Sequence, residues 1–287
     1  MHKIQQVKRQ QLFIISGALA LLVLLFFFGK TTLPKKSSPA AMPSQAAANT
    51  PVQFNDLLAK AKQKLTEAQI QKLAGLENAV IRGDVNDQKM HVFHQLAHFW
   101  KDSAKIFEPY AYYTGEAAKL ENSEKSLTFA AQLFVDNLLI EGDPTMQSWL
   151  ATNAKDLLDR ALKINPDNDS SKIGIGACYM FGSISNNPMQ GILTVRDVVQ
   201  KNPDNLYGQM ILGLGGKKSG QYDKAIEHFI IIVTKQPKNL EAIFQLAECY
   251  ELKADKVNAI KWYKEGEKLV PDEEIKKQIE KRINELK

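Results

Sequence analysis

From residue 53 onward, apolar residues recur with the spacing of helices rather than of strands. They fall at i, i+3, i+4 and i+7, and Gly, Pro or Asn interrupts the pattern every 12–18 residues. This spacing lines up apolar side chains along one face of an α-helix, whereas a strand would alternate them at every second position. The pattern therefore predicts an all-α body built from consecutive short helices.

Four prolines mark a repeat within this helical pattern. Pro166, Pro203, Pro237 and Pro271 stand in the similar settings ALKINPD, VVQKNPDN, IVTKQPKN and EKLVPDE, at intervals of 37, 34 and 34 residues. Because proline lacks the backbone N–H donor and clashes with the preceding turn, each is expected just beyond the end of a helix. The spacing predicts pairs of antiparallel helices that stack on one another.

Residues 240–273 form the clearest unit, and their pattern resembles that of the tetratricopeptide repeat (TPR) family. The family's packing positions are filled by apolar or small residues followed by proline: Ile243, Leu246, Ala247, Tyr250, Ala259, Tyr263, Gly266 and Pro271. Residues 206–239 and 172–205 repeat the pattern, with Gly216 in place of the usual tyrosine and Gly191 in place of the usual alanine. The resemblance implies an α-solenoid of helix hairpins.

The segment LFIISGALALLVLLFFF, residues 12–28, is apolar enough to enter a membrane. Thirteen of its 17 residues are Leu, Ile, Val or Phe. With Gly29 it would span ~27 Å as a helix, about one hydrocarbon core. A cleaved signal peptide is the alternative, but no small-x-small cleavage pattern follows closely. We therefore expect a single N-terminal transmembrane helix.

The predicted organisation has six parts. They are a short tail (1–11), the transmembrane anchor (12–29), a Pro/Ala/Ser-rich linker (30–52), divergent helical repeats (53–134), regular TPR repeats (135–271) and a C-terminal capping helix (272–287). Within the divergent part, residues 53–82 are expected to form a helix pair, with Thr66-Glu67-Ala68-Gln69 as the N-cap of its second helix. The capping helix carries four apolar residues on one face: Ile275, Ile279, Ile283 and Leu286.

The excess positive charge of the chain lies around the anchor. Residues 1–50 hold six lysines or arginines and no acid, which leaves 31 bases against 32 acids in the rest. A near-neutral body gives no electrostatic reason to expect a nucleic-acid partner. Basic residues flank the anchor almost equally, so charge alone does not fix its orientation. The linker is similar in composition to exported spacers of bacterial inner-membrane proteins, which implies a single-pass inner-membrane protein with a periplasmic body.

Three of the five histidines lie in the stretch HVFHQLAHFW, residues 91–100. On a helix, His91, His94 and His98 fall within a ~60° arc. If Met90 begins a repeat, the resemblance places them on the concave face, where the family's ligands lie. A metal site at His94 and His98 is an alternative because their i, i+4 spacing could hold one ion. A second alternative is that the preceding helix pair covers all three histidines.

The same register selects an apolar set from the regular repeats. These residues are Ile173, Met180, Tyr207, Met210, Leu214 and Phe244. An exposed apolar strip of this kind indicates a partner-binding groove, and methionine-rich surfaces accommodate varied partners. A neighbouring helix could instead cover the strip and make it core. Glutamate at positions 207 and 244 would distinguish the two, because it would abolish binding at an open groove and disrupt folding in a core.

No motif for catalysis or cofactor binding is present. The chain lacks nucleotide-binding, hydrolase and paired-carboxylate patterns, so we expect no enzyme, no cofactor and no small-molecule substrate. Cys178 and Cys249 each lie in a helical apolar pattern and are expected to be free, buried thiols, with a disulfide or redox role as the alternative.

One anchor and an exported repeat body are similar in architecture to the ancillary chaperone-like subunit of the bacterial Sec translocon. That resemblance implies a membrane-anchored scaffold that binds protein segments or clients through its concave groove. A dedicated assembly factor for one envelope complex, for example in cytochrome c maturation, is the alternative within the same architecture. A metal-dependent activity at His94 and His98 is a third possibility of a different class.

Overall fold

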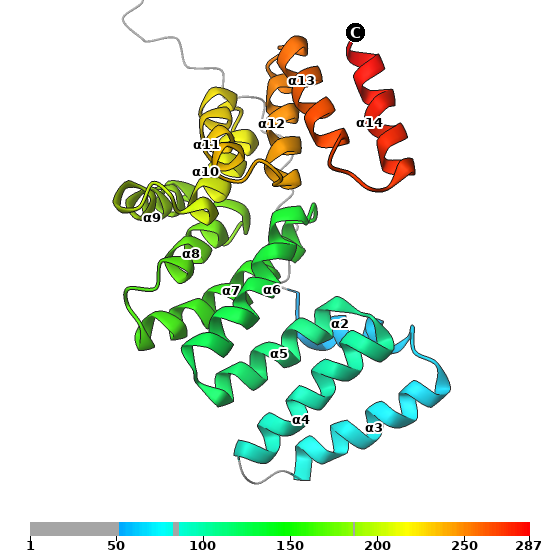
Figure 1. Cartoon of the computed structure of the whole chain (residues 1–287). Coiled ribbons are helices and arrows are strands. Elements are labelled where there is room, and N and C mark those ends of the chain that lie inside the picture. Colours follow the sequence, from blue (N-terminus) through cyan, green and yellow to red (C-terminus); the bar gives the residue numbers. More distant parts are fainter. Residues whose placement is uncertain (1–51, 83–85, 186) are drawn as a thin grey trace, which may run out of the picture. The chain divides into compact units, whose positions relative to one another are not determined.

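The computed structural model describes residues 52–82, 86–185 and 187–287, and all of its regular elements are helices (Figure 1). The all-α prediction is therefore confirmed for these ranges. In chain order the elements are α2 (Phe54–Lys62), α3 (Glu67–Arg82), α4 (Asn86–His98), η1 (Phe99–Ala104), α5 (Phe107–Glu121), α6 (Glu124–Ile140), α7 (Pro144–Ile164), α8 (Asp169–Phe181), α9 (Pro188–Lys201), α10 (Leu206–Lys218), α11 (Tyr222–Lys235), α12 (Leu240–Leu252), α13 (Lys256–Glu267) and α14 (Glu273–Leu286).

The predicted tail, anchor and nearly all of the linker lie outside the described residues. Among the helices of the described residues, none is both long enough and apolar enough to cross a membrane.

From α4 onward the helices pair as hairpins. The pairs are α4–α5, α6–α7, α8–α9, α10–α11 and α12–α13, and each hairpin packs on the next along the chain. The last three pairs correspond to the repeats predicted at 172–205, 206–239 and 240–273. The boundary predicted between residues 134 and 135 falls inside α6, which belongs to a hairpin of its own. This is the helix-pair stacking of an α-solenoid.

One loop design recurs three times and joins four successive hairpins. A proline stands two residues beyond the end of the second helix: Pro166 after α7, Pro203 after α9 and Pro237 after α11. The next helix then starts at an asparagine whose side chain accepts a backbone N–H three residues on: Asn168 for α8 (2.7 Å), Asn205 for α10 (3.0 Å) and Asn239 for α12 (3.0 Å). The proline closes one helix and the asparagine satisfies a free donor of the next, so the sequence itself fixes both ends of the loop.

The packing positions expected from the TPR resemblance lie in the core. Ile243, Leu246, Ala247, Ala259 and Tyr263 are all at most 8% exposed. Small residues also permit close approach where α8 meets α9, because a methyl group on Gly191 would collide with the backbone of α8 and with Tyr179. The glycine that departs from the family pattern at position 191 is therefore required by the short distance between these two helices.

Buried side chains of the helices up to α10 form two clusters, and Phe54 and Tyr112 pack against both. The first, here called the N-terminal core, includes Leu73, Leu96 and Trp100. The second, called the central core, runs from Ala111 on α5 to Leu212 on α10. Two further clusters of buried side chains lie among the helices from α11 to α14.

The first two helices do not form the expected pair. α2 packs on α5, where the rings of Phe54 and Tyr112 stack at 3.4 Å between centroids, and α3 packs on α4. Contact between α2 and α3 includes the ion pair of Lys62 with Glu77 (2.8 Å). The predicted N-cap of α3 is confirmed: the Thr66 amide donates to Gln69 Oε1 (2.9 Å), and the Gln69 amide donates to Thr66 Oγ1 (3.4 Å).

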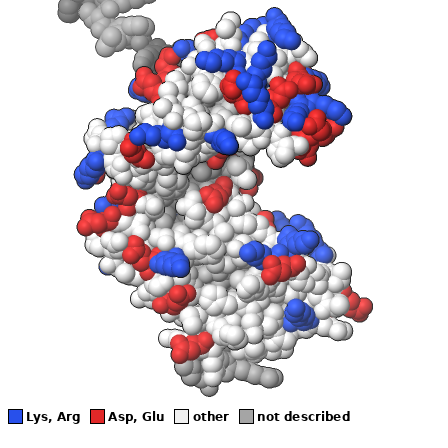
Figure 2. Space-filling model, in the orientation of Figure 1, with Lys and Arg blue, Asp and Glu red and all other residues white. Residues whose placement is uncertain are grey.

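Helix α14 packs on α13 through the apolar face predicted for it. Ile279, Ile283 and Leu286 are buried, whereas Ile275 is 46% exposed. Arg282 forms an ion pair with Glu251 and so links α14 to α12. Figure 2 shows charged side chains crowded over this C-terminal end and spaced more widely over α4–α7.

Candidate protein-binding site

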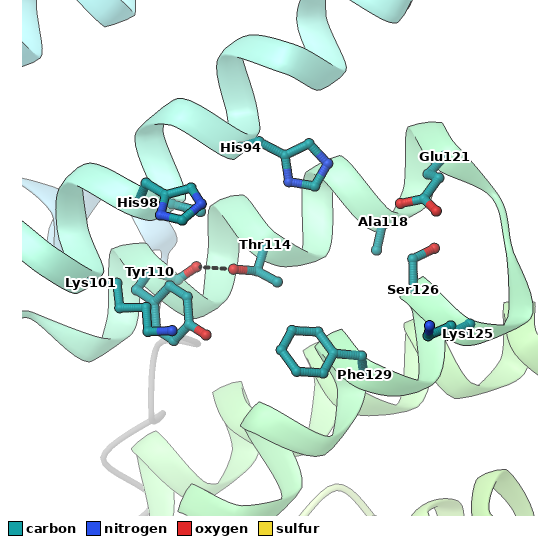
Figure 3. A pocket seen from close by; sticks show the side chains of 11 residues that line it. His94, His98, Lys101, Tyr110, Thr114, Ala118, Glu121, Lys125, Ser126 and Phe129 are labelled. Carbon is teal, nitrogen blue, oxygen red and sulfur yellow. Dashed lines mark hydrogen bonds between the residues drawn. The ribbon is translucent and has the colours of Figure 1, made fainter.

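The three clustered histidines are exposed along α4 and its end. His98 Nδ1 lies 3.0 Å from an Asp102 carboxylate oxygen, and His91 Nε2 lies 3.1 Å from the side-chain nitrogen of Gln95. His94 has neither kind of partner and points into a cavity (Figure 3). Across the described ranges, no three His, Cys, Asp or Glu side chains are grouped so as to hold a metal ion.

A short π-helix, η1, changes the direction of the chain directly after His98. It ends at Lys105, which has a left-handed backbone (φ 56°), and the Ile106 amide closes the turn by donating to the Trp100 carbonyl (3.0 Å). Trp100 is fully buried and anchors the turn in the N-terminal core. The turn places the Lys101 ammonium over the ring of Tyr110, 5.6 Å from its centroid. Such π-turns within helices are frequent at functional sites.

A cavity of about 450 Å³ lies between α4, α5 and α6. It is lined by His94, Ala97 and His98 of α4, Lys101 of η1, Tyr110, Thr114, Ala118 and Glu121 of α5, and Lys125, Ser126 and Phe129 of α6. Figure 3 shows His94 and Phe129 on opposite sides of the cavity, with Thr114 and Ala118 on the floor between them. The size is within the range of about 300–1,000 Å³ that is usual for ligand pockets.

The cavity has an apolar centre and polar ends. Phe129 is 58% exposed at its edge, whereas Leu127, Phe134 and Leu138 of the same helix are buried. Thr114 donates its hydroxyl hydrogen to the Tyr110 carbonyl (2.8 Å), so that group is already satisfied. Neither Lys101 nor Lys125 has an acidic partner, while Glu121 accepts a hydrogen bond from the Ser123 hydroxyl (3.1 Å). An apolar pocket with few fixed polar groups is suited to taking up a side chain.

The apolar residues selected from the regular repeats are placed differently from expectation. Ile173 is fully buried against the start of α10, so its predicted exposure in a groove is wrong. Tyr207 also turns inward: its hydroxyl is buried and faces Gln132 of α6, and this burial raises the pKa of the phenol.

The remaining four residues of that set are partly buried against neighbouring helices. Phe244 covers Gly266 of its own hairpin, and Met180 lies against Gly191 and Gly215. Met210 and Leu214 of α10 pack on the core formed by α11 and α12. These contacts make the set chiefly intramolecular packing. Of the three predicted histidines, His94 and His98 line the cavity between α4, α5 and α6, whereas His91 does not.

Several residues of the cavity were missed by the sequence reasoning. Lys101, Thr114, Lys125 and Phe129 come from three elements and share no simple spacing. One signal was available for Phe129: in the stretch SLTFAAQLFVDNLL it falls outside the stripe made by Leu127, Ala130 and Phe134. A large aromatic residue outside the buried stripe of a helix must either meet another element or remain exposed.

The two cysteines are free and buried. Burial raises the pKa of the Cys178 thiol to about 12 and that of the Cys249 thiol to about 11. Because the thiolate is the reactive form, neither side chain offers a nucleophile near neutral pH.

Comparison with known proteins gives similarities of fold only. No family model and no curated protein matches the chain. Among solved structures it is similar to a tetratricopeptide repeat protein from Parabacteroides merdae ATCC 43184 (13% identity, 79% of this chain and 96% of that one, TM-score 0.44). It is also similar to MamA from Desulfovibrio magneticus RS-1 (18% identity, 65% and 96% covered, TM-score 0.43) and to YrrB, described as a TPR protein with an unusual peptide-binding site (15%, 72% and 97%, TM-score 0.41). All three scores are below 0.5, so the repeat architecture rests on the hairpins themselves.

Proposed function

We propose that this protein is a scaffold that binds a segment of another protein in the cavity between α4, α5 and α6. The observation that carries the proposal is Phe129, a large aromatic side chain held 58% exposed at the edge of an apolar cavity. Large exposed aromatic groups at concave sites mark binding surfaces, and aromatic residues dominate the energetics of protein interfaces.

The size of the cavity limits the strength of the interaction. One partner side chain buried there contributes roughly 1.5–3 kcal/mol, whereas association costs at least ~4 kcal/mol. Binding therefore requires further contacts along the neighbouring helices, and the complex exchanges readily. Tethering to a surface would offset part of this cost by raising the effective concentration of the partner.

A membrane anchor at residues 12–29 supplies that tether in our proposal. We place the anchor in the bacterial inner membrane and the repeats in the periplasm, on the basis of the apolar segment and the linker composition. The scaffold then has a chaperone or assembly role at the cell envelope. A general chaperone would contact many exported proteins, whereas a dedicated assembly factor would contact one.

Site-specific photocrosslinking in cells tests the proposal. Benzoylphenylalanine replaces Phe129 in the full chain, and the control replaces Ile140, which is 83% exposed on the same helix. Partners that crosslink from position 129 and not from 140, and that are lost when Thr114→Phe fills the cavity floor, support the proposal. Equal crosslinking from both positions, or no effect of Thr114→Phe in a folded protein, would exclude this cavity as the binding site.

A further inference from the structure

We infer that the bound segment is acidic and inserts one aromatic side chain between His94 and Phe129. This inference rests on the proposed function and specifies its partner. It follows from the shape of the cavity, from the charges at its ends and from the composition of the rest of the chain.

The shape favours a flat side chain. His94 from α4 and Phe129 from α6 stand on opposite sides of the opening, and the floor between them consists of Ala118 and Thr114 (Figure 3). The walls are thus two rings and the floor is small and largely apolar. Aromatic rings gain additional stabilisation when they meet other rings offset or edge to face, which a branched aliphatic side chain does not.

The charges favour an acidic segment. Lys101 lies on the π-helix side of the cavity and Lys125 on the α5–α6 side, and neither ammonium has a carboxylate partner. Glu121 is the one acid among the lining residues, so the two lysines give the lining an excess of positive charge. A carboxylate next to the inserted ring would therefore meet an unpaired ammonium at either end, which fixes position and steers association.

The composition of the chain argues against its own N-terminal segment as the occupant. Residues 1–50 contain six basic residues and no acid, and their aromatic residues all lie within the apolar stretch 12–28. Such a segment would bring like charge towards Lys101 and Lys125. The occupant that fits is a separate protein with the opposite charge.

Fluorescence anisotropy with the full-length protein in detergent micelles tests the inference. The probe is a short fluorescein-labelled peptide with a central phenylalanine flanked by aspartates in an otherwise glycine–serine sequence. We expect saturable binding that weakens as salt is raised. Phe129→Ser should lower the affinity about tenfold or more, and Lys101→Glu or Lys125→Glu severalfold with a smaller salt dependence.

Matched variants separate specific from general effects. Ile140→Ser removes an exposed apolar side chain from the same helix, and Lys163→Glu makes the same charge change on α7 outside this cavity; both should bind as the wild type does. Circular dichroism checks that each variant is folded. Equal binding of a peptide with lysines in place of aspartates, or with alanine in place of phenylalanine, would overturn the inference.

Two other outcomes would also overturn it. Free phenylalanine competing as well as the peptide would show a small-molecule pocket, and peptide-induced loss of a dimer would show a contact between copies of this chain. Crosslinking from position 129 in cells without peptide binding would refute the acidic aromatic partner alone. Failure of both experiments would refute the proposed function as well.

Discussion

Two residues 34 positions apart provide a test of the repeat geometry within one molecule. Gly220 follows α10 with φ 73°, and Ala254 follows α12 with φ 61°. Both turns have the same bonds: the Gly220 and Ala254 amides donate to carbonyls three residues back (3.1 and 2.8 Å), and the following amides donate to carbonyls five residues back (2.8 and 2.9 Å). The alanine thus occupies a left-handed position that the neighbouring repeat fills with glycine.

The expected effect of exchanging these residues can be worked out from the backbone alone. A left-handed backbone costs an L-residue roughly 1–2 kcal/mol relative to glycine. The smaller conformational freedom of unfolded alanine offsets ~0.4–1 kcal/mol of this cost. No atom lies within 4 Å of a Cβ built on Gly220, and Ala254 is exposed, so packing contributes little at either site. Ala254→Gly should therefore stabilise the protein by about 0.5–1 kcal/mol, and Gly220→Ala should destabilise it by a similar amount.

Thermal unfolding followed by circular dichroism measures both variants against the wild type. A change of this size corresponds to a shift in Tm of about 1–4 °C for a body of this length, upwards for Ala254→Gly and downwards for Gly220→Ala. The double variant should have nearly the wild-type Tm, because the two backbone effects are opposite and similar in size. The Lys253–Asp223 ion pair joins the two turns, but neither substitution removes a partner of it, so the effects should add. A lower Tm for Ala254→Gly would refute the assignment of strain to this turn.

Three further changes test separate features of the body. Gly191→Ala restores the residue usual in the family but should cost about 1–3 kcal/mol by overpacking, which urea unfolding would measure. Asn205→Ala removes the cap of α10 and should cost ~1 kcal/mol in the same assay, whereas Asn205→Asp should cost much less. Burial lowers the pKa of His228, with Glu227 opposing and Arg196 adding to the shift. Below pH ~6.5 the unfolded chain therefore binds more protons than the folded one, and the stability due to this neutral histidine is lost as the pH falls. His228→Gln should flatten the loss of stability between pH 7.5 and 5; an unchanged pH slope would contradict this.

The repeats could be predicted from sequence because their signals are local. A proline ends a helix, and an asparagine two residues later caps the next, without help from distant parts of the chain. The same is true of the Thr66–Gln69 cap. Pairing of α2 with α5 depends instead on the contact between Phe54 and Tyr112, which are far apart in the sequence. No local pattern indicates that contact.

Register predicts the face of a helix on which a side chain lies but not how far that side chain is covered. Phe244 and Ile173 both occupy positions assigned to the concave face. Each turns into a space left by a glycine on another helix, Gly266 for Phe244 and Gly208 for Ile173. In consequence, the variant with Tyr207→Glu and Phe244→Glu is expected to unfold at lower temperature.

The cavity was hidden from sequence reasoning for a different reason. Lys101 reaches it because η1 adds a π-turn after α4, and the sequence FWKDSA carries no recognised signal for that geometry. Phe129 and Thr114 then contribute from two other helices. The histidines indicated the correct region of the chain. The other residues that line the cavity could be identified only from the positions of three helices in space.

The division of the buried side chains into an N-terminal core and a central core bears on how the body opens. The cavity is bounded by Ala97, which belongs to the first core, and by Ala118, which belongs to the second. Any occupant touches both clusters and is released when either comes apart. Binding should therefore make two foldons behave as one, visible as amides of α4 and α6 that exchange hydrogen independently in the free protein and together in the complex.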